Sequence, residues 1–107
     1  MANEFAQARQ QALDVKNFLR EGHLRSALHS AGLAAQAALS PALSKGELAD
    51  LRRILEKVVY IINFDPVFRQ VCPEGVVYAG GEERRLAQDL FRLEETVESA
   101  RQSLEEE

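Results

Sequence analysis

The residues with the clearest capacity for chemistry are two histidines and one cysteine. His23 and His29 lie six positions apart, which does not place them on one face of a helix. Neither belongs to a Glu-x-x-His or His-x-x-x-His pair, and the sequence has no Cys-x-x-Cys, so no metal-ligand spacing is present. Cys72 has no histidine beside it in the sequence to serve as its base. We therefore expect a structural thiol, two surface or turn histidines, no metal, no cofactor and no enzymatic activity.

Two glycines and several arginines are candidate sites for phosphate or nucleic acid. Gly80 and Gly81 precede an expected helix, but Glu82 and Glu83 follow them and would repel an anion while complementing the helix dipole. The net charge is -4, which disfavours a phosphate backbone as partner. The basic side chains alternate with acids and are typical of solvated faces; they are Arg52, Arg53, Lys57, Arg84, Arg85 and Arg92. We expect no binding of nucleic acid.

Length and composition indicate one globular domain over residues 1–107. Hydrophobic residues make up 46% of the chain and charged residues 28%, which is ordinary for a folded domain. A lone cysteine fits a reducing compartment, and the N-terminal residues lack the pattern of a signal peptide. No apolar run approaches the roughly 20 residues that span a bilayer. These features predict a cytoplasmic protein without a membrane segment.

Apolar periodicity predicts helices over residues 4–20, 24–39, 44–62, 66–71 and 82–104. Ser44 and Glu47 form a capping box at the start of the third helix, and Asp65 followed by Pro66 begins the fourth. The second half of helix 44–62 is apolar nearly all round, which predicts that it is the most buried helix. Segment 73–81 is expected to cross over the bundle without forming a strand.

A glycine turn and a row of small residues organise the first two helices. Gly22 leaves a tight connection, so helices 4–20 and 24–39 should form an antiparallel αα-hairpin. Ala27, Ala31 and Ala34 recur on one face and would let a neighbouring backbone approach closely. Gly32 costs about 1 kcal/mol of helix propensity relative to alanine, which close packing would offset. The predicted fold is all-α: an irregular four-helix bundle built on this N-terminal hairpin, with a short extra helix and a long C-terminal helix.

Within residues 15–41, Phe18, Gly22, Ala27 and Ala34 match positions of a tetratricopeptide repeat. The hairpin therefore resembles that family, which places an aromatic late in its first helix, a glycine in the turn and two alanines seven apart in its second. One repeat's worth is present, so we expect a single hairpin and no solenoid. The resemblance implies protein binding.

The same stretch is similar to HEPN-type helical bundles, which join a glycine turn to an alanine-rich helix. Members that cleave RNA carry arginine and histidine at an Arg-x-x-x-x-His type of spacing. Arg25 and His29 are separated by three residues here, and Arg20 and His23 by two, so neither pair fits.

Two stretches are candidate interaction surfaces. Aromatic side chains gather around the irregular segment, where they either fill the core or line a groove for a partner peptide. With the neighbouring arginines, the candidate partner-binding residues are Tyr60, Phe64, Phe68, Arg69, Tyr78, Arg84 and Arg85. The unbroken apolar stripe of helix 82–104 serves either the core or a homodimer seam; it comprises Leu86, Leu90, Leu93, Val97, Ala100 and Leu104.

These observations favour a non-enzymatic protein–protein interaction or adaptor domain. The alternatives are a HEPN-like bundle associated with a nucleic-acid-acting system, and a structural homodimer. For the homodimer, Leu93→Asp is the discriminating change, because it would separate the copies while leaving helicity mostly intact. A fully unfolded product would show instead that Leu93 belongs to the core of the monomer.

Overall fold

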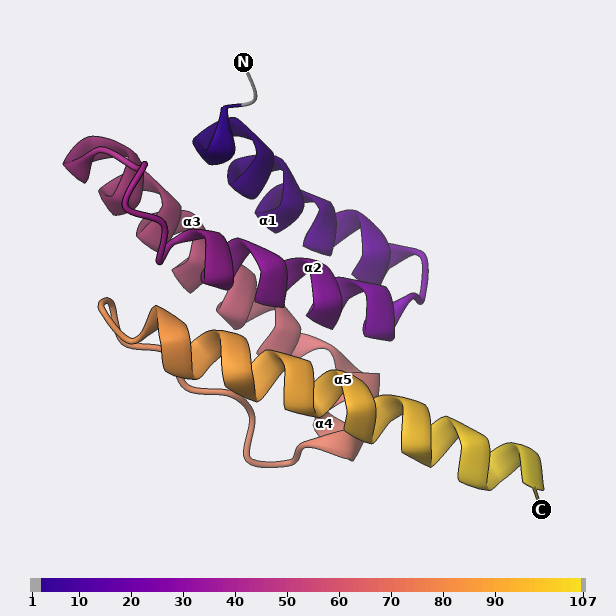
Figure 1. Ribbon diagram of the computed structural model, residues 1–107. Helices are drawn as coiled ribbons and strands as arrows, with labels where there is room; N and C mark the ends of the chain where they lie inside the picture. The colour runs from indigo at the N-terminus through magenta and orange to yellow at the C-terminus, as the bar shows by residue number, and fades with distance from the viewer. Residues whose placement is uncertain (1–2, 107) are drawn as a thin grey trace.

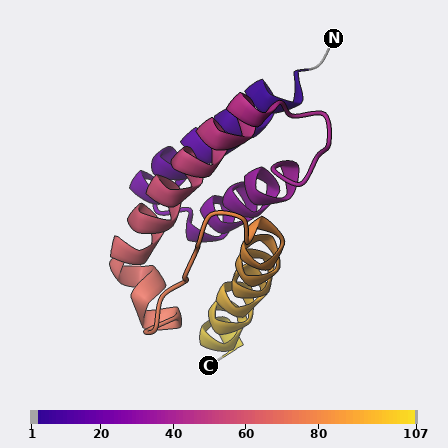
Figure 2. The same cartoon turned by 90° about the vertical axis from the view of Figure 1, so that its left-hand side faces the viewer.

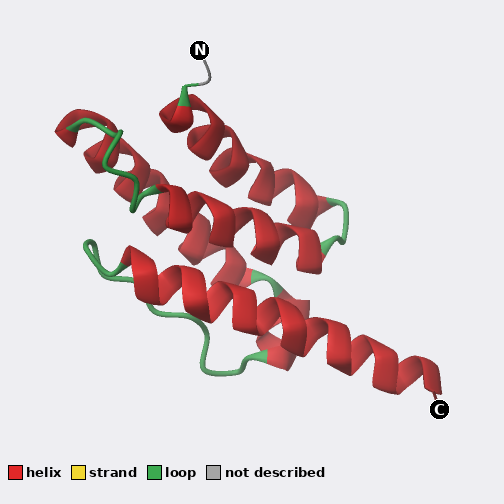
Figure 3. Ribbon diagram, in the orientation of Figure 1, coloured by secondary structure: helices red, strands yellow, loops and turns green. Residues whose placement is uncertain are grey.

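The computed structural model describes the backbone of residues 3–106 and the side chains of residues 3–100 and 102. It contains five helices (Figure 1): α1 (Glu4–Arg20), α2 (Leu24–Ala37), α3 (Lys45–Phe64), α4 (Pro66–Val71) and α5 (Glu83–Glu106). No strand occurs within residues 3–106 (Figure 3). The predicted all-α bundle, with its N-terminal hairpin, short extra helix and long last helix, is confirmed.

The helix boundaries follow from local capping chemistry. After α1, Gly22 adopts a φ of +80°, and the N–H groups of Gly22 and His23 donate to the carbonyls of Leu19 and Phe18, as in a Schellman motif. The capping box predicted at α3 is present: Ser44 Oγ accepts from the Glu47 N–H and the Glu47 carboxylate accepts from the Ser44 N–H. The predicted ends differ from the observed ones by two residues at most.

The most buried helix is α2, so the prediction that α3 would hold this place is wrong. Eight of the 14 residues of α2 are buried, against five of the 20 residues of α3. The reason is the position of α2, which packs against α1 on one side and α5 on the other, whereas α3 packs mainly on α1 (Figures 1 and 2). The apolar second half of α3 therefore keeps one side in solvent.

The small residues of α2 allow close contacts with both neighbours, as predicted. On the α1 side, Ser30 Oγ donates to the Gln11 carbonyl oxygen at 2.6 Å. On the α5 side, Gly32 lies under the ring of Phe91, and a Cβ added to Gly32 would lie only 2.6 Å from Phe91 Cε1. The absence of a side chain at Gly32 is thus what lets Phe91 pack there.

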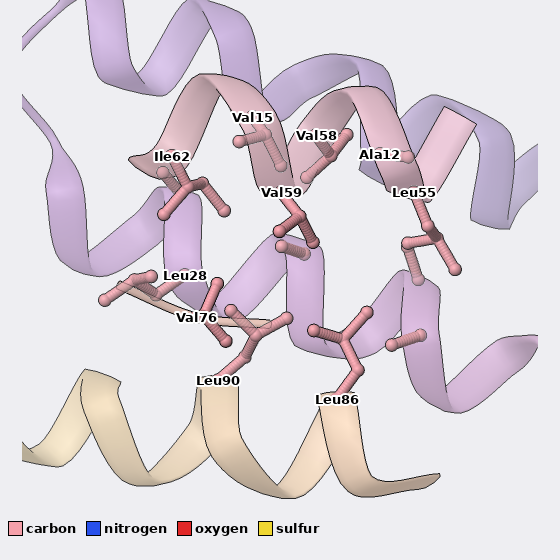
Figure 4. Close-up of a cluster of buried hydrophobic side chains, with 14 of the residues drawn as sticks. Ala12, Val15, Leu28, Leu55, Val58, Val59, Ile62, Val76, Leu86 and Leu90 are labelled. Atoms are coloured by element: carbon pink, nitrogen blue, oxygen red, sulfur yellow. The ribbon is translucent and has the colours of Figure 1, made fainter. Parts of the chain in front are cut away.

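The crossover between α4 and α5 lies over the bundle and is tied to α3. Val76 inserts into the core beside Leu28 and Leu90 (Figure 4). The Asn63 side chain holds the Val76 backbone by two hydrogen bonds: Nδ2 donates to the Val76 carbonyl at 2.9 Å, and Oδ1 accepts from the Val76 N–H at 2.8 Å. An amide side chain thus supplies the pairing that a neighbouring strand would otherwise provide.

The long dimension of the molecule comes from α5. The molecule measures 49 × 28 × 20 Å, and the last turns of α5 extend past the other helices (Figure 1). The exposure of Ser99, Ala100 and Gln102 agrees with this. None of the described helices is both long enough and apolar enough to cross a membrane.

Candidate interaction surface

Two aromatic side chains in the last turns of α3 face solvent together. Tyr60 is 62% exposed and Phe64 is 70% exposed. Their spacing of four residues places them on one helical face, and their ring centroids lie 4.7 Å apart with the rings tilted by 39°. They pack on each other on the side of α3 that no helix covers, so a contiguous aromatic area faces solvent.

Phe64 borders a shallow cavity on each side. One has a volume of about 380 Å³ and is lined by Tyr60, Asn63, Phe64 and Arg69. The other has a volume of about 320 Å³ and brings in the end of α1 through Lys16, Leu19 and Arg20. We call the combined area the Phe64 surface and define it by Lys16, Arg20, Tyr60, Asn63, Phe64 and Arg69.

The Phe64 surface is positively charged although the whole chain is negative. Lys16, Arg20 and Arg69 are all exposed, and none of them forms an ion pair with a described side chain. Asp65 also lines one cavity, but its carboxylate caps α4 by accepting the Phe68 N–H at 2.9 Å. Three cations and one carboxylate therefore surround the aromatic pair, so the surface keeps a net positive charge.

The structure brings only part of the predicted partner-binding set together. Tyr60, Phe64 and Arg69 share the Phe64 surface. Phe68 was wrongly placed in this set: it is 0% exposed, because the Asp65 cap turns α4 so that Phe68 points back into the core. Arg84 and Arg85 are exposed in the first turn of α5, toward the other end of the molecule from the last turn of α3 (Figure 1).

Tyr78 belongs to a different cluster, centred on Glu83, which the sequence indicated only as an acid at the start of a helix. Glu83 is only 2% exposed, and Arg52 donates to it from Nε. Tyr78 Oη and the Gly81 N–H each donate to the same Glu83 oxygen at 3.1 Å. Arg52, expected on a wet face, is therefore the partner of a buried acid, and Glu83 joins α3, the crossover and α5.

The ionisation of this cluster follows from its contacts. Burial opposes the charge on Glu83, but hydrogen bonds from Arg52, from backbone N–H groups and from Tyr78 outweigh it, so the pKa of Glu83 is lowered. Burial, reinforced by the charge of Glu83, raises the pKa of Tyr78 far above its ordinary value. The Tyr78 phenol therefore stays protonated and remains a donor to the carboxylate.

Arg25 and His29, one of the two pairs compared with HEPN-type bundles, contact carboxylates of α5. His29 Nδ1 lies 2.9 Å from Glu94 Oε2. Arg25 Nη1 lies 3.2 Å from a Glu98 oxygen and Arg25 Nε lies 3.7 Å from Glu94. These contacts hold α2 against α5, and they border an open cavity of about 540 Å³ between α1, α2 and α5. His29 and Glu94 are 65 positions apart in the sequence, so no local spacing indicates their contact.

The thiol of Cys72, the remaining candidate for a reactive group, lies in a turn. Cys72 is half-buried, and its Sγ donates to the Gly75 carbonyl at 3.5 Å. Within the described part of the chain, no three His, Cys, Asp or Glu side chains are placed to hold a metal ion.

Comparison with known proteins gives no relatives for this arrangement. No protein-family model matches the chain, and neither a curated protein nor a solved structure proved similar to it.

Proposed function

We propose that this chain is a non-enzymatic protein–protein interaction domain and that it binds its partner at the Phe64 surface. The observation that carries the proposal is the exposed pair of Tyr60 and Phe64, whose rings pack against each other beside the exposed cations Lys16, Arg20 and Arg69. Burying a phenylalanine is worth about 1.5–3 kcal/mol, so leaving both rings in water forgoes a substantial stabilisation that a partner would recover.

The composition of the surface supports this assignment. Interface centres are enriched in tyrosine, phenylalanine and arginine, and the residues whose truncation weakens binding most are drawn largely from tyrosine, tryptophan and arginine. The resemblance of the first hairpin to a tetratricopeptide repeat also implies protein binding. We propose a cytoplasmic location, for which the single cysteine is the support.

The test compares the wild-type chain with Tyr60→Ser/Phe64→Ser as immobilised bait in a lysate of the source cells. Val77→Ser is the matched control, because Val77 is 79% exposed and lies on the crossover, outside the Phe64 surface. Each captured protein is then purified and its affinity measured by calorimetry. We expect at least a tenfold weaker affinity for the double variant, since each lost aromatic anchor costs about 1–2 kcal/mol.

Equal affinities of the wild type and the double variant for every purified partner would contradict the proposal. Circular dichroism of both chains is the folding control, and we expect matching spectra because the two substituted side chains face solvent.

The HEPN-like alternative stays a prediction, tested by RNA binding at low salt and its loss as salt rises. Arg25 and His29 face Glu94 and Glu98, so no observation favours this alternative over protein binding.

A further inference from the structure

The apolar stripe of α5 is not the surface that a partner would cover. Leu86, Leu90 and Leu93 are at most 9% exposed and pack in the core of their own chain. The expected homodimer seam along the whole of helix 82–104 is therefore wrong for residues 86–93. Leu93→Asp would strike the core of the monomer and cannot report on a dimer alone.

Two exposed rows of side chains, one on α1 and one on α3, end at the Phe64 surface. Each row repeats at spacings of four, three and four residues, which places its members on one helical face. The row of α1 is Arg9, Leu13, Lys16 and Arg20, and the row of α3 is Arg53, Lys57, Tyr60 and Phe64. All eight side chains are exposed, five are cations and none is an acid. We call them the basic rows.

The basic rows lie beside each other. α1 packs on α3, and the two helices run in the same direction (Figures 1 and 2). The last members of the rows, Arg20 and Phe64, line one cavity of about 320 Å³. Because each row covers three helical turns, the two rows continue side by side from this cavity for about 17 Å.

The face keeps a positive charge after its bordering acids are counted. Four cations of the basic rows form no ion pair with a described side chain, and Arg53 lies 3.7 Å from Asp50 at an exposed position. Arg69 of the Phe64 surface adds a sixth cation. The bordering acids are Glu21, Asp50, Glu56 and Asp65. The face therefore carries a net charge of +2, whereas the whole chain has a net charge of -4.

This arrangement is complementary to a helix that is both acidic and apolar. Two adjacent helices with rows at helical spacing offer a face on which a third helix packs, with its apolar side chains toward Leu13, Tyr60 and Phe64. Acids beside that apolar stripe then meet the cations. The cavities on the two sides of Phe64 can receive side chains, which a flat lipid surface does not supply. Two such faces would oppose cation to cation, so the face is not complementary to itself.

We propose that the partner of the Phe64 surface is an acidic amphipathic helix of another protein, which lies along the basic rows. This inference rests on the proposed function and names the chemistry of the partner. It also extends the binding face by Arg9, Leu13, Arg53 and Lys57, which lie outside the Phe64 surface.

Selection from a phage library of random peptides tests the chemistry of the partner. The purified wild-type chain is the immobilised target, and the peptides have about 16 residues, enough for about four helical turns. We expect enrichment of peptides in which apolar residues recur at helical spacing and acids flank them. The affinity of one enriched peptide, made synthetically, is then measured by fluorescence anisotropy.

Arg9→Gln/Lys57→Gln tests the extension of the face, because it removes two cations of the basic rows outside the Phe64 surface. We expect about fivefold weaker affinity for the peptide, since an exposed ion pair contributes up to about 1 kcal/mol. Arg84→Gln/Arg85→Gln is the matched control, which removes two exposed cations from the first turn of α5 and should leave the affinity unchanged. Circular dichroism checks that both variants remain folded.

A selection that enriches no peptide, or peptides without an excess of acids, would overturn the inference. Equal affinities of Arg9→Gln/Lys57→Gln and its control would overturn it too. Two other probes represent other classes of partner: vesicles of phosphatidylserine and phosphatidylcholine, and an RNA of about 20 uridines. If either probe bound more tightly than the peptide and lost affinity for Arg9→Gln/Lys57→Gln, the partner would not be an acidic helix.

The proposed function is judged separately from this inference. It would survive these contrary results if a captured protein still lost affinity for Tyr60→Ser/Phe64→Ser. It would fall together with the inference if no captured protein depended on these two residues.

Discussion

At the scale of single residues, the packing around Gly32 predicts that Gly32→Ala is destabilising, whereas helix propensity alone predicts that it is stabilising. Gly32→Ala should lower the free energy of unfolding by about 1–3 kcal/mol, because the added methyl group overpacks against Phe91. Gly46→Ala is the matched control in open space on α3, and it should raise stability by up to about 1 kcal/mol. Urea denaturation measures both. A stabilising Gly32→Ala would show that the close contact with Phe91 is not required.

Glu83 makes the stability of the fold depend on pH. Its folded-state pKa is lowered, so its carboxylate stabilises the fold above the ordinary value of 4.5, and this stabilisation is lost as the pH falls through the folded-state pKa. Glu83→Gln should therefore lower the free energy of unfolding at pH 7 by about 1–3 kcal/mol. The difference from the wild type should shrink toward pH 3, as measured by urea denaturation at both pH values.

Glu82→Gln is the control for that measurement, because Glu82 is the exposed neighbour. A deficit of Glu83→Gln that stays the same from pH 7 to pH 3 would contradict the assigned role of the charge. The sequence could not reveal this role, since Arg52 and Tyr78 meet Glu83 only after α3 and α5 have packed.

At the scale of the element, α5 divides into a buried half and a projecting half. Leu93→Asp should leave the monomer largely unfolded, because it places a carboxylate in the hydrophobic core at a position that is only 9% exposed. Thr96→Asp, an exposed change one turn further along, should retain the helical circular dichroism spectrum. A folded Leu93→Asp monomer would show that the stripe is not part of the core at that position.

The helices were largely predictable from the sequence, because capping residues close in the sequence determine where they begin and end. Gly22, the Ser44–Glu47 capping box and Asp65–Pro66 each act within a few residues. The burial of each helix was less predictable. The apolar second half of α3 indicated the most buried helix. Burial, however, depends on how a helix is surrounded, and α2 packs extensively against both α1 and α5, whereas α3 packs mainly on α1. Likewise, Tyr60 and Phe68 are both aromatic residues of predicted helices, and the packing of α3 and α4 decides that Tyr60 is exposed and Phe68 is buried.

At the scale of the whole molecule, charge is segregated over the fold. The chain is negative overall, and six of its 17 acids lie in residues 94–107 of the sequence, whereas the cations Lys16, Arg20 and Arg69 lie at the Phe64 surface. The sequence supplied Tyr60, Phe64 and Arg69 of this surface. It did not supply Lys16 and Arg20, which are more than 40 positions away in the sequence and reach Phe64 because α1 packs on α3.

Photo-crosslinking from position 64 tests the central claim most directly. The purified chain carries benzoylphenylalanine in place of Phe64, and a second preparation carries it in place of Val77 as control. After irradiation together with a partner captured by the wild-type chain, we predict a covalent adduct of the chain with that partner from position 64, with the crosslink mapped by mass spectrometry. Position 77 should give no such adduct. An irradiated chain that gives no adduct from position 64, or equal adducts from both positions, would contradict partner binding at the Phe64 surface.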